Sequence, residues 1–332
     1  MEQQRSGIPS FEAAPSPPGG GTSPQAGKRE LSLELVHASE AAALSCASLL
    51  GKGDPERISE VAADAMRSTL ERSSLTGTIA LSPRHQTQLP QGTVIGGGDH
   101  KVDLGIYALE GASQVARGHI NSISTLVAVE PGGFARLPAV QQVEKFVAGP
   151  AARGAIDLDG SIADNLRRIA FANDVRVQDL TVAILERPRH QDLIAEVAAT
   201  GARIRTLEEG DFASAVMAAL PGTGIDAAIG VGDLHAALIA ACAVRCLGGE
   251  FLARLMPRND EEKRVMGEGG TRVYGLADLA PAGDISVAVT GVTGGPLLPG
   301  VTFGSGFAET SSLVMSSRHG TIRRLTTRHR LV

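Results

Sequence analysis

The sequence feature that most constrains the fold is a repeated alternation of strand and helix in the second half of the chain. Short runs with strand composition are each followed by a segment with helical spacing, at residues 180–185 and 190–199, 203–207 and 212–220, and 225–231 and 235–247. Because parallel strands need crossover connections, which are usually helices, this alternation predicts a parallel or mixed sheet covered by helices. The chain is therefore expected to be an α/β protein.

The first half predicts two helices and three strands. Residues 33–50 should form a helix that ends at Gly51, and Asp54 is placed to cap a second helix with Pro55 at its first position. Strands are expected at residues 77–81, 102–109 and 123–129, and near the C-terminus at 285–290 and 312–316. Residues 1–30, rich in Pro, Gly and polar side chains, are predicted to be a disordered extension. We expect the rest to divide near Gly149 into residues 31–149 and 150–332.

Composition and charge exclude several classes of protein. The formal net charge of −5 argues against a nucleic-acid-binding protein, and the arginines of residues 321–330 are interpreted as a solvated basic end. No apolar run approaches the roughly 20 residues of a membrane-spanning helix, so a soluble, cytoplasmic protein is expected. The cysteines Cys46, Cys242 and Cys246 are expected to be free thiols in a reducing compartment.

Short motifs occur in a fixed order from about residue 31 to residue 330. They include Gly51-Lys52-Gly53-Asp54, Gly77-Thr78-Ile79, Leu109-Glu110-Gly111, Val143-Glu144-Lys145, Pro188-Arg189-His190, Glu209-Gly210-Asp211 and Thr290-Gly291-Val292-Thr293-Gly294. In this order and spacing the set resembles the class II fructose-1,6-bisphosphatases of the sugar-phosphatase superfamily. The resemblance implies a layered αβαβα fold, a homo-oligomer, and hydrolysis of the 1-phosphate of fructose 1,6-bisphosphate in gluconeogenesis.

The same resemblance implies Mg²⁺ or Mn²⁺ held by carboxylates at five positions. Only Glu110 is retained, and the other positions are occupied by Ser59, Pro83, Tyr107 and Ala236. A threonine of the family that would contact the substrate is replaced by Ala112. Because a single Glu offers too few oxygen ligands for Mg²⁺, tight metal binding and conventional catalysis are expected to be lost. No catalytic residue is assigned.

The positions that contact the sugar phosphate in the family are better preserved. They are Glu110, Gly111, the run Arg187-Pro188-Arg189, and the run Glu209-Gly210-Asp211. Two guanidinium groups can bind a phosphate with paired hydrogen bonds, and the carboxylates can accept hydrogen bonds from sugar hydroxyls. The alternative for Asp211 is that it only caps the helix that follows. Two further contacts have changed, to Gln142 and Asp233.

Histidines near the lost positions leave a rebuilt site open as an alternative. His85, His100 and His235, with Asp99, Asp103 and Asp233, could supply ligands that suit Zn²⁺ or Fe better than Mg²⁺. Their spacing matches no metal motif, so surface histidines are the favoured interpretation.

Three functions remain open at this point. The preferred hypothesis is a catalytically impaired protein that binds a phosphosugar or an active homologue, as a regulator or partner subunit. The second is an active metal-dependent fructose-1,6-bisphosphatase with an altered metal site, and the third is a structural oligomer. Retention of Arg187, Arg189 and Asp211 favours the first hypothesis over the third. Loss of carboxylates at Ser59, Tyr107 and Ala236 weighs against the second.

Overall fold

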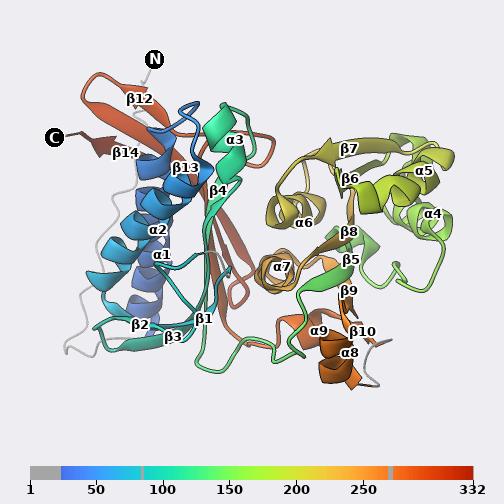
Figure 1. Ribbon diagram of the computed structural model, residues 1–332, viewed down its shortest axis with the longest axis horizontal. Helices are drawn as coiled ribbons and strands as arrows, with labels where there is room; N and C mark the ends of the chain where they lie inside the picture. Colours follow the sequence, from blue (N-terminus) through green and yellow to red (C-terminus); the bar gives the residue numbers. More distant parts are fainter. Residues whose placement is uncertain (1–23, 84–85, 268–271, 332) are drawn as a thin grey trace, which may run out of the picture.

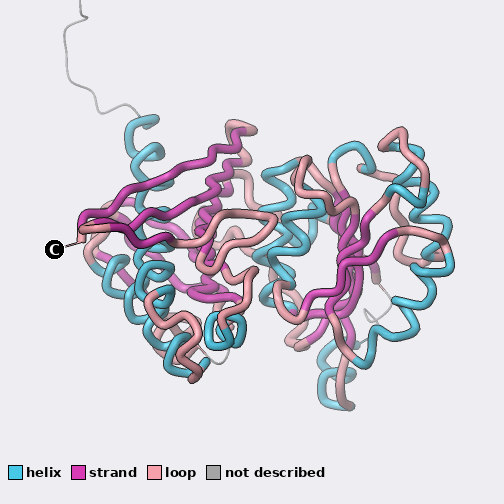
Figure 2. Tube along the Cα trace, turned by 90° about the horizontal axis from the view of Figure 1, so that it is seen from above, coloured by secondary structure: helices cyan, strands magenta, loops and turns pink. Residues whose placement is uncertain are grey.

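Two sheets alternate with three layers of helices in the computed structural model, which describes residues 24–83, 86–267 and 272–331 (Figure 1). Helices α1 (Pro24–Ala47) and α2 (Pro55–Glu71) cover the outer face of the first sheet. Helices α6 (Asp211–Ala219) and α7 (Leu234–Leu247) lie between the sheets, and α4 (Ile162–Ala172) and α5 (Gln191–Ala199) cover the outer face of the second. Figure 2 shows the two sheets from above with helices between them. The αβαβα layering is confirmed.

The first sheet contains eight strands: seven follow the order β12-β13-β11-β4-β3-β1-β2, and the eighth, β14, also pairs with β13. Only β1 and β3 are parallel neighbours, and the other pairs are antiparallel. The strands are β1 (Leu75–Leu81), β2 (Val94–Gly96), β3 (His100–Glu110), β4 (Ile123–Val129), β11 (Ile285–Gly291), β12 (Thr302–Gly304), β13 (Phe307–Ser316) and β14 (Thr321–Arg330).

The second sheet has six strands in the order β10-β9-β5-β8-β6-β7. Strands β6, β7 and β8 run parallel, as the alternation in the sequence predicts, while β5 is antiparallel to its neighbours. The strands are β5 (Gln142–Ala148), β6 (Thr181–Leu185), β7 (Arg203–Leu207), β8 (Ala227–Asp233), β9 (Glu250–Met256) and β10 (Val273–Tyr274). Three short helices complete the fold: α3 (Ala112–Arg117), α8 (Asp260–Met266) and α9 (Leu276–Leu279).

Sheet membership does not change at Gly149, where we expected the chain to divide. Strand β5 precedes this residue but lies in the second sheet, and β11 to β14 follow it but belong to the first. The chain therefore leaves the first sheet after β4, builds the second, and returns to complete the first. Gly149 and Pro150 lie in a connection that follows β5 of the second sheet, and Pro150 begins a short 3-10 helix there.

Helix α7 is buried on nearly all sides because it lies between the two sheets. Twelve of its residues are buried, and most of them are Ala, Leu, Val or Cys. Small side chains allow a helix to approach a sheet closely, so this composition suits the central layer. Cys242 and Cys246 belong to this buried set and form no disulfide, and burial raises the pKa of the Cys246 thiol to about 12.

Regular structure at both chain ends extends beyond the predicted elements. Helix α1 begins at Pro24, whereas the predicted helix begins at residue 33, and residues 1–23 lie outside the described residues. The arginine-rich segment near the C-terminus, expected to be a solvated basic end, forms strand β14, in which no side chain is fully buried. The start of α2 is as predicted, since Asp54 accepts a hydrogen bond from the Arg57 amide at 2.9 Å. Of the described helices, none has the length and apolar content needed to cross a bilayer.

Candidate functional site

The parallel strands of the second sheet bring three distant motifs to one edge. Arg187-Pro188-Arg189 follows β6, Glu209-Gly210-Asp211 follows β7, and Asp233 ends β8. The register places Leu185 opposite Leu207 at the carboxyl ends of β6 and β7. Antiparallel β5 begins at this same edge, since Gln142 pairs with Asp233. The carboxyl edge of a parallel sheet is where open α/β proteins place ligands, so the motifs share a location suited to binding.

Glu110 reaches this edge from the first sheet. Its carboxylate accepts hydrogen bonds from the backbone amides of Phe212 at 2.9 Å and Ala213 at 3.1 Å, one to each oxygen. These amides belong to the first turn of α6, which has Gly210 as its N-cap and so no capping side chain of its own. Glu110 therefore satisfies helix amides that otherwise have no partner, and its negative charge faces the positive end of the helix.

Burial raises the pKa of Glu110 to about 7. Hydrogen bonds from Phe212 and Ala213 and the charge of Lys145 oppose this rise, whereas the neighbouring Asp211 adds to it. The retained family carboxylate is thus a buried group held in a structural contact. Both of its oxygens are already engaged by protein donors.

Asp211 does not cap α6, contrary to the alternative considered from the sequence. It is the first residue of the helix, and its Oδ1 forms an ion pair with Lys145 Nζ from β5. Both side chains are largely buried, and Asp211 Oδ2 has no hydrogen-bond partner among the described residues. A Cβ atom at Gly232 would lie 2.1 Å from this oxygen, so the glycine leaves the space that Asp211 occupies.

The two arginines extend from the turn between β6 and α5. Arg189 is exposed and donates one hydrogen bond from Nη2 to the Val231 carbonyl oxygen at 2.8 Å. Desolvation and the nearby charge of Arg187 lower the pKa of Arg189, and Asp211 opposes that effect. Arg187 is half-buried and donates to the Glu186 carbonyl oxygen at 2.8 Å. The two guanidinium groups therefore lie near each other and near Asp211.

His190 fixes this turn and was not identified as a site residue from the sequence. Its Nδ1 lies 2.7 Å from the Leu185 carbonyl oxygen, and its Nε2 accepts a hydrogen bond from the Val231 amide at 2.9 Å. Burial lowers its pKa, so the ring is neutral and bridges β6 to β8. Lys145 was also overlooked as a site residue. The sequence contained a signal for both His190 and Lys145, because each lies within a motif that resembles the family.

The positions at which the resemblance implies metal-binding carboxylates carry side chains with other roles. Tyr107 on β3 lies among Glu110, Asp233, Asp211 and Glu209, and these charges together with burial raise the pKa of its hydroxyl, which stays protonated. Ala236 is buried in the first turn of α7, where Asp233 accepts the hydrogen bond from its amide at 3.0 Å. Ser59 is half-buried on α2, and Pro83 is buried just after β1.

Gly111 adopts a backbone conformation that favours glycine. Its φ of +90° is in the left-handed region, and a Cβ there would lie 2.7 Å from the Ser122 hydroxyl oxygen. That hydroxyl donates to the Gly111 carbonyl oxygen at 2.8 Å. Glycine at this position therefore allows β3 to turn directly into α3 after Glu110.

The donor set present here does not fit a divalent metal of the kind the resemblance implies. Both carboxylate oxygens of Glu110 accept hydrogen bonds from amides of α6. Tyr107 has a protonated hydroxyl where the resemblance implies a carboxylate. Among the described residues, no group of three His, Cys, Asp or Glu side chains is arranged to hold a metal ion. Mg²⁺ and Mn²⁺ need several oxygen ligands at once, which this arrangement does not supply.

The rebuilt histidine site is not assembled either. His100 begins β3, at the opposite end of that strand from Glu110. Asp103 accepts a hydrogen bond from the Gly132 amide at 2.8 Å, and Asp99 is exposed. Among the described residues, His235 is paired with one carboxylate, that of Asp233, with 3.8 Å between Nδ1 and Oδ1, and His85 lies outside the described residues.

Comparison with known proteins covers almost the whole chain. Residues 29–329 match the family described as "Bacterial fructose-1,6-bisphosphatase, glpX-encoded". The chain is 32% identical over 324 residues to "Fructose-1,6-bisphosphatase 1 class 2" of Escherichia coli, which covers 92% of this chain and 96% of that protein. "Fructose-1,6-bisphosphatase class 2" of Shigella flexneri gives the same identity and coverage. Layering, motif order and these matches agree, and the chain belongs to the family of bacterial class 2 fructose-1,6-bisphosphatases.

Proposed function

We propose that this chain binds a phosphorylated sugar without hydrolysing it, and acts as a regulator or partner subunit of an active homologue. The observation that carries the proposal is the hydrogen bonding of Glu110. This single retained family carboxylate gives both oxygens to the amides of Phe212 and Ala213. A metal at this position would compete with two buried amide donors, each of which costs about 1–3 kcal/mol when left unpaired.

Binding of the phosphate is assigned to Arg187 and Arg189. A guanidinium group has five N–H donors, and Arg189 uses one of them on Val231. The remaining donors are free to form paired hydrogen bonds with a phosphate. The acidic neighbours Glu209 and Asp211 would repel a phosphate, so the arginines have to carry that charge.

Binding of the sugar is assigned mainly to Glu209. This half-buried side chain forms no hydrogen bond or ion pair with the described residues, so its oxygens remain able to accept from hydroxyl groups. Asp211 is held by Lys145 and contributes Oδ2, a buried acceptor that lacks a partner among the described residues. Gly210, with φ of +111°, sets the turn that places these two carboxylates around the start of α6.

The test compares binding with turnover. Fructose 6-phosphate and fructose 1,6-bisphosphate are titrated calorimetrically into the wild type, Arg189→Ala and Arg205→Ala, an exposed arginine in β7 that serves as a matched control. Loss of one charged contact should weaken binding by about 1.5–3 kcal/mol, roughly 10- to 100-fold, in Arg189→Ala only. Absence of binding by the wild type would leave the purely structural hypothesis.

The second candidate function is an active metal-dependent phosphatase, which family membership favours. Phosphate release from fructose 1,6-bisphosphate with Mg²⁺ or Mn²⁺ decides between the two. Turnover above about 1 per second would establish the enzyme and overturn the binding-only proposal. A homologue-regulating role is tested separately, by measuring whether added chain changes the turnover of an active class 2 relative.

A further inference from the structure

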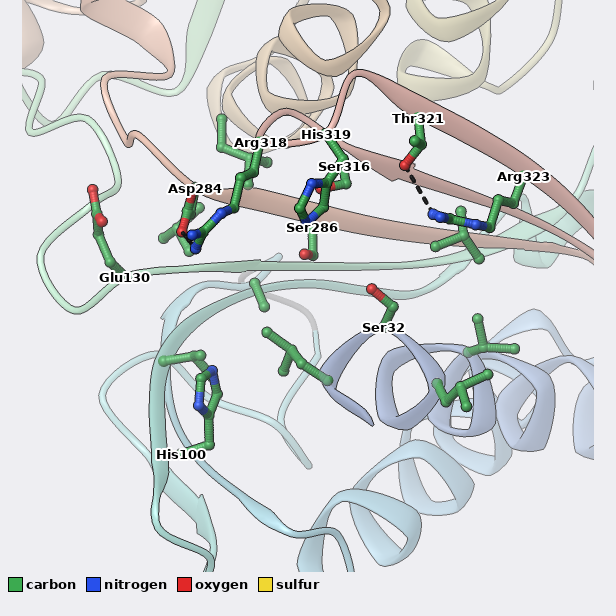
Figure 3. Close-up of a pocket in the computed structure, with 18 of the residues that line it drawn as sticks. Ser32, His100, Glu130, Asp284, Ser286, Ser316, Arg318, His319, Thr321 and Arg323 are labelled. Atoms are coloured by element: carbon green, nitrogen blue, oxygen red, sulfur yellow. Dashed lines mark hydrogen bonds and ion pairs between the residues drawn. The ribbon is translucent and has the colours of Figure 1, made fainter. Parts of the chain in front are cut away.

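A cavity of about 800 Å³ lies at the other end of the first sheet, away from the site described above (Figure 3). It is enclosed by the start of α1, the ends of β3, β4, β11 and β13, and the turn into β14. His100 lines it, whereas Glu110 is at the opposite end of the same 11-residue strand. At about 3.3 Å per residue these two ends are about 33 Å apart, so the cavity is separate from the phosphosugar site.

The inner wall of the cavity is apolar. Side chains from four elements form it: Val36 of α1, Val102 of β3, Ala128 of β4, and Val314 of β13. Leu325 of β14 continues this wall at the outer side. The volume of the cavity is typical of small-molecule sites, and its apolar wall favours a ligand with an apolar body.

The rim of the cavity carries cationic and hydroxyl groups. Arg318 forms an ion pair with Asp284 at 3.2 Å, and the Glu130 carboxylate accepts from the Gly283 amide at 3.0 Å. By contrast, no ion pair among the described residues involves Lys101 or Arg323. The Arg323 guanidinium donates only to the Thr321 hydroxyl, at 2.8 Å. The rim therefore has cationic donors that are not neutralised by described carboxylates.

Arg323 and Ser32 lie on facing walls. Figure 3 shows Arg323 reaching from β14 back over the cavity toward Thr321, and Ser32 pointing up from α1 beneath it. The guanidinium and the two hydroxyls can donate to the oxygens of one anionic group held between them. His319, from the turn before β14, lines the same cavity.

We propose that this cavity is a second binding site, for a small amphiphilic anion with one phosphate or carboxylate group and a compact apolar body. Arg323, Ser32 and Thr321 bind the anionic group, and the wall formed by Val102, Ala128 and Val314 takes the apolar body. A free sugar phosphate is a poor ligand here, because its hydroxyls would face a wall without polar partners.

The experiment uses phenyl phosphate as the probe, with inorganic phosphate and phenol as its two halves. Calorimetric titration is carried out on the full chain and on Arg323→Gln, Ser286→Leu and Arg324→Gln. Ser286 is half-buried and lines the cavity, so leucine there fills the volume without a change in charge. Arg324 is the next residue on β14, where neighbouring side chains point to opposite faces, and it makes the charge-matched control.

We expect the wild type to bind phenyl phosphate more tightly than either half. Arg323→Gln and Ser286→Leu should each weaken binding about 10-fold or more, and Arg324→Gln should not. Binding should persist in Arg189→Ala and in the presence of saturating fructose 6-phosphate, which separates this site from the proposed phosphosugar site. Equal losses in Arg323→Gln and Arg324→Gln, or equal affinity for phenyl phosphate and inorganic phosphate, would overturn the proposal. So would the absence of saturable binding of phenyl phosphate in the millimolar range.

Discussion

The two sides of the family site have diverged to different extents. On the side of the first sheet, Tyr107 occupies a position where the resemblance implies a metal-binding aspartate. The carboxylate of Glu110 accepts hydrogen bonds from two backbone amides of α6. On the side of the second sheet, Arg187 and Arg189 keep the family pattern, and Glu209 has no partner among the described residues. Three of the four positions without the implied carboxylate, Ser59, Pro83 and Tyr107, lie on the first-sheet side. The fourth, Ala236, lies at the start of α7 on the second-sheet side. The contact of Glu110 with α6 still joins the two sides.

The largest effect is expected from restoring the aspartate of the family at Tyr107 alone. Tyr107→Asp removes an aromatic ring that packs against the interlayer core, which costs about 3–5 kcal/mol, and adds a charge beside four carboxylates. Urea unfolding should show this loss, while Tyr107→Phe should change stability by less than about 1 kcal/mol. A stable Tyr107→Asp protein would mean that the first-sheet side tolerates a carboxylate at this position.

A comparable effect is expected at the buried ion pair on the second-sheet side. Lys145→Met leaves the Asp211 carboxylate buried without its cation and should destabilise the protein by about 3–5 kcal/mol. Replacing both partners, as in Lys145→Met with Asp211→Leu, should recover most of that loss in urea unfolding. If the double variant is no more stable than Lys145→Met, the pair is not the source of the effect.

The pH dependence of stability should report on Glu110. Its pKa in the folded protein is about 7, above the ordinary value of 4.5, so the folded state holds its proton more tightly than the unfolded state. The contribution of Glu110 to stability is therefore full below about pH 4.5 and falls as the pH rises toward 7, by up to about 3 kcal/mol. Glu110→Gln should flatten this part of the profile of unfolding free energy. An unchanged slope in the variant would assign the titration to another group.

The smallest effect is expected from divalent metals. Titration with Mg²⁺ or Mn²⁺ should show no tight site, because a single Glu supplies too few oxygen ligands and both Glu110 oxygens already accept hydrogen bonds from buried amides. Submicromolar binding that is lost in Glu110→Gln would contradict this expectation. Tight Zn²⁺ binding that His235→Ala removes would instead revive the rebuilt-site alternative.

Local patterns in the sequence predicted much of the fold but not its long-range contacts. The limits of β4 and β7 agree with the predicted ranges. Strand β4 is a largely apolar, fully buried run, whereas β7 (RIRTL) is marked by its position between two predicted helices. Strands β5 and β9 were not predicted, because their polar side chains interrupt the apolar pattern on one face. Strand β14 was interpreted only as a solvated basic end, because its four arginines leave no continuous apolar run; its strand structure comes from pairing with β13.

The candidate site was also predicted in part: its local motifs were identified, and its long-range contacts were not. Chain order and family motifs identified Arg187, Arg189 and Glu209, and the parallel strands confirmed that their segments share one edge of the sheet. The roles of Glu110 and Asp211 depend on partners 102 and 66 residues away, and no local pattern encodes such a contact.

The path of the chain through the two sheets has a consequence during synthesis on the ribosome. Strand β4 is buried along its full length, and its outer edge pairs with β11, which is made more than 150 residues later. Until Ile285–Gly291 has emerged and paired, the nascent chain presents β4 as an apolar, unpaired edge, which is a hazard for aggregation. The first sheet is therefore completed only after the strands of the second sheet have been made, and contacts of such long sequence separation form slowly. A chain that stalls after the second sheet should depend on chaperones that bind exposed strands.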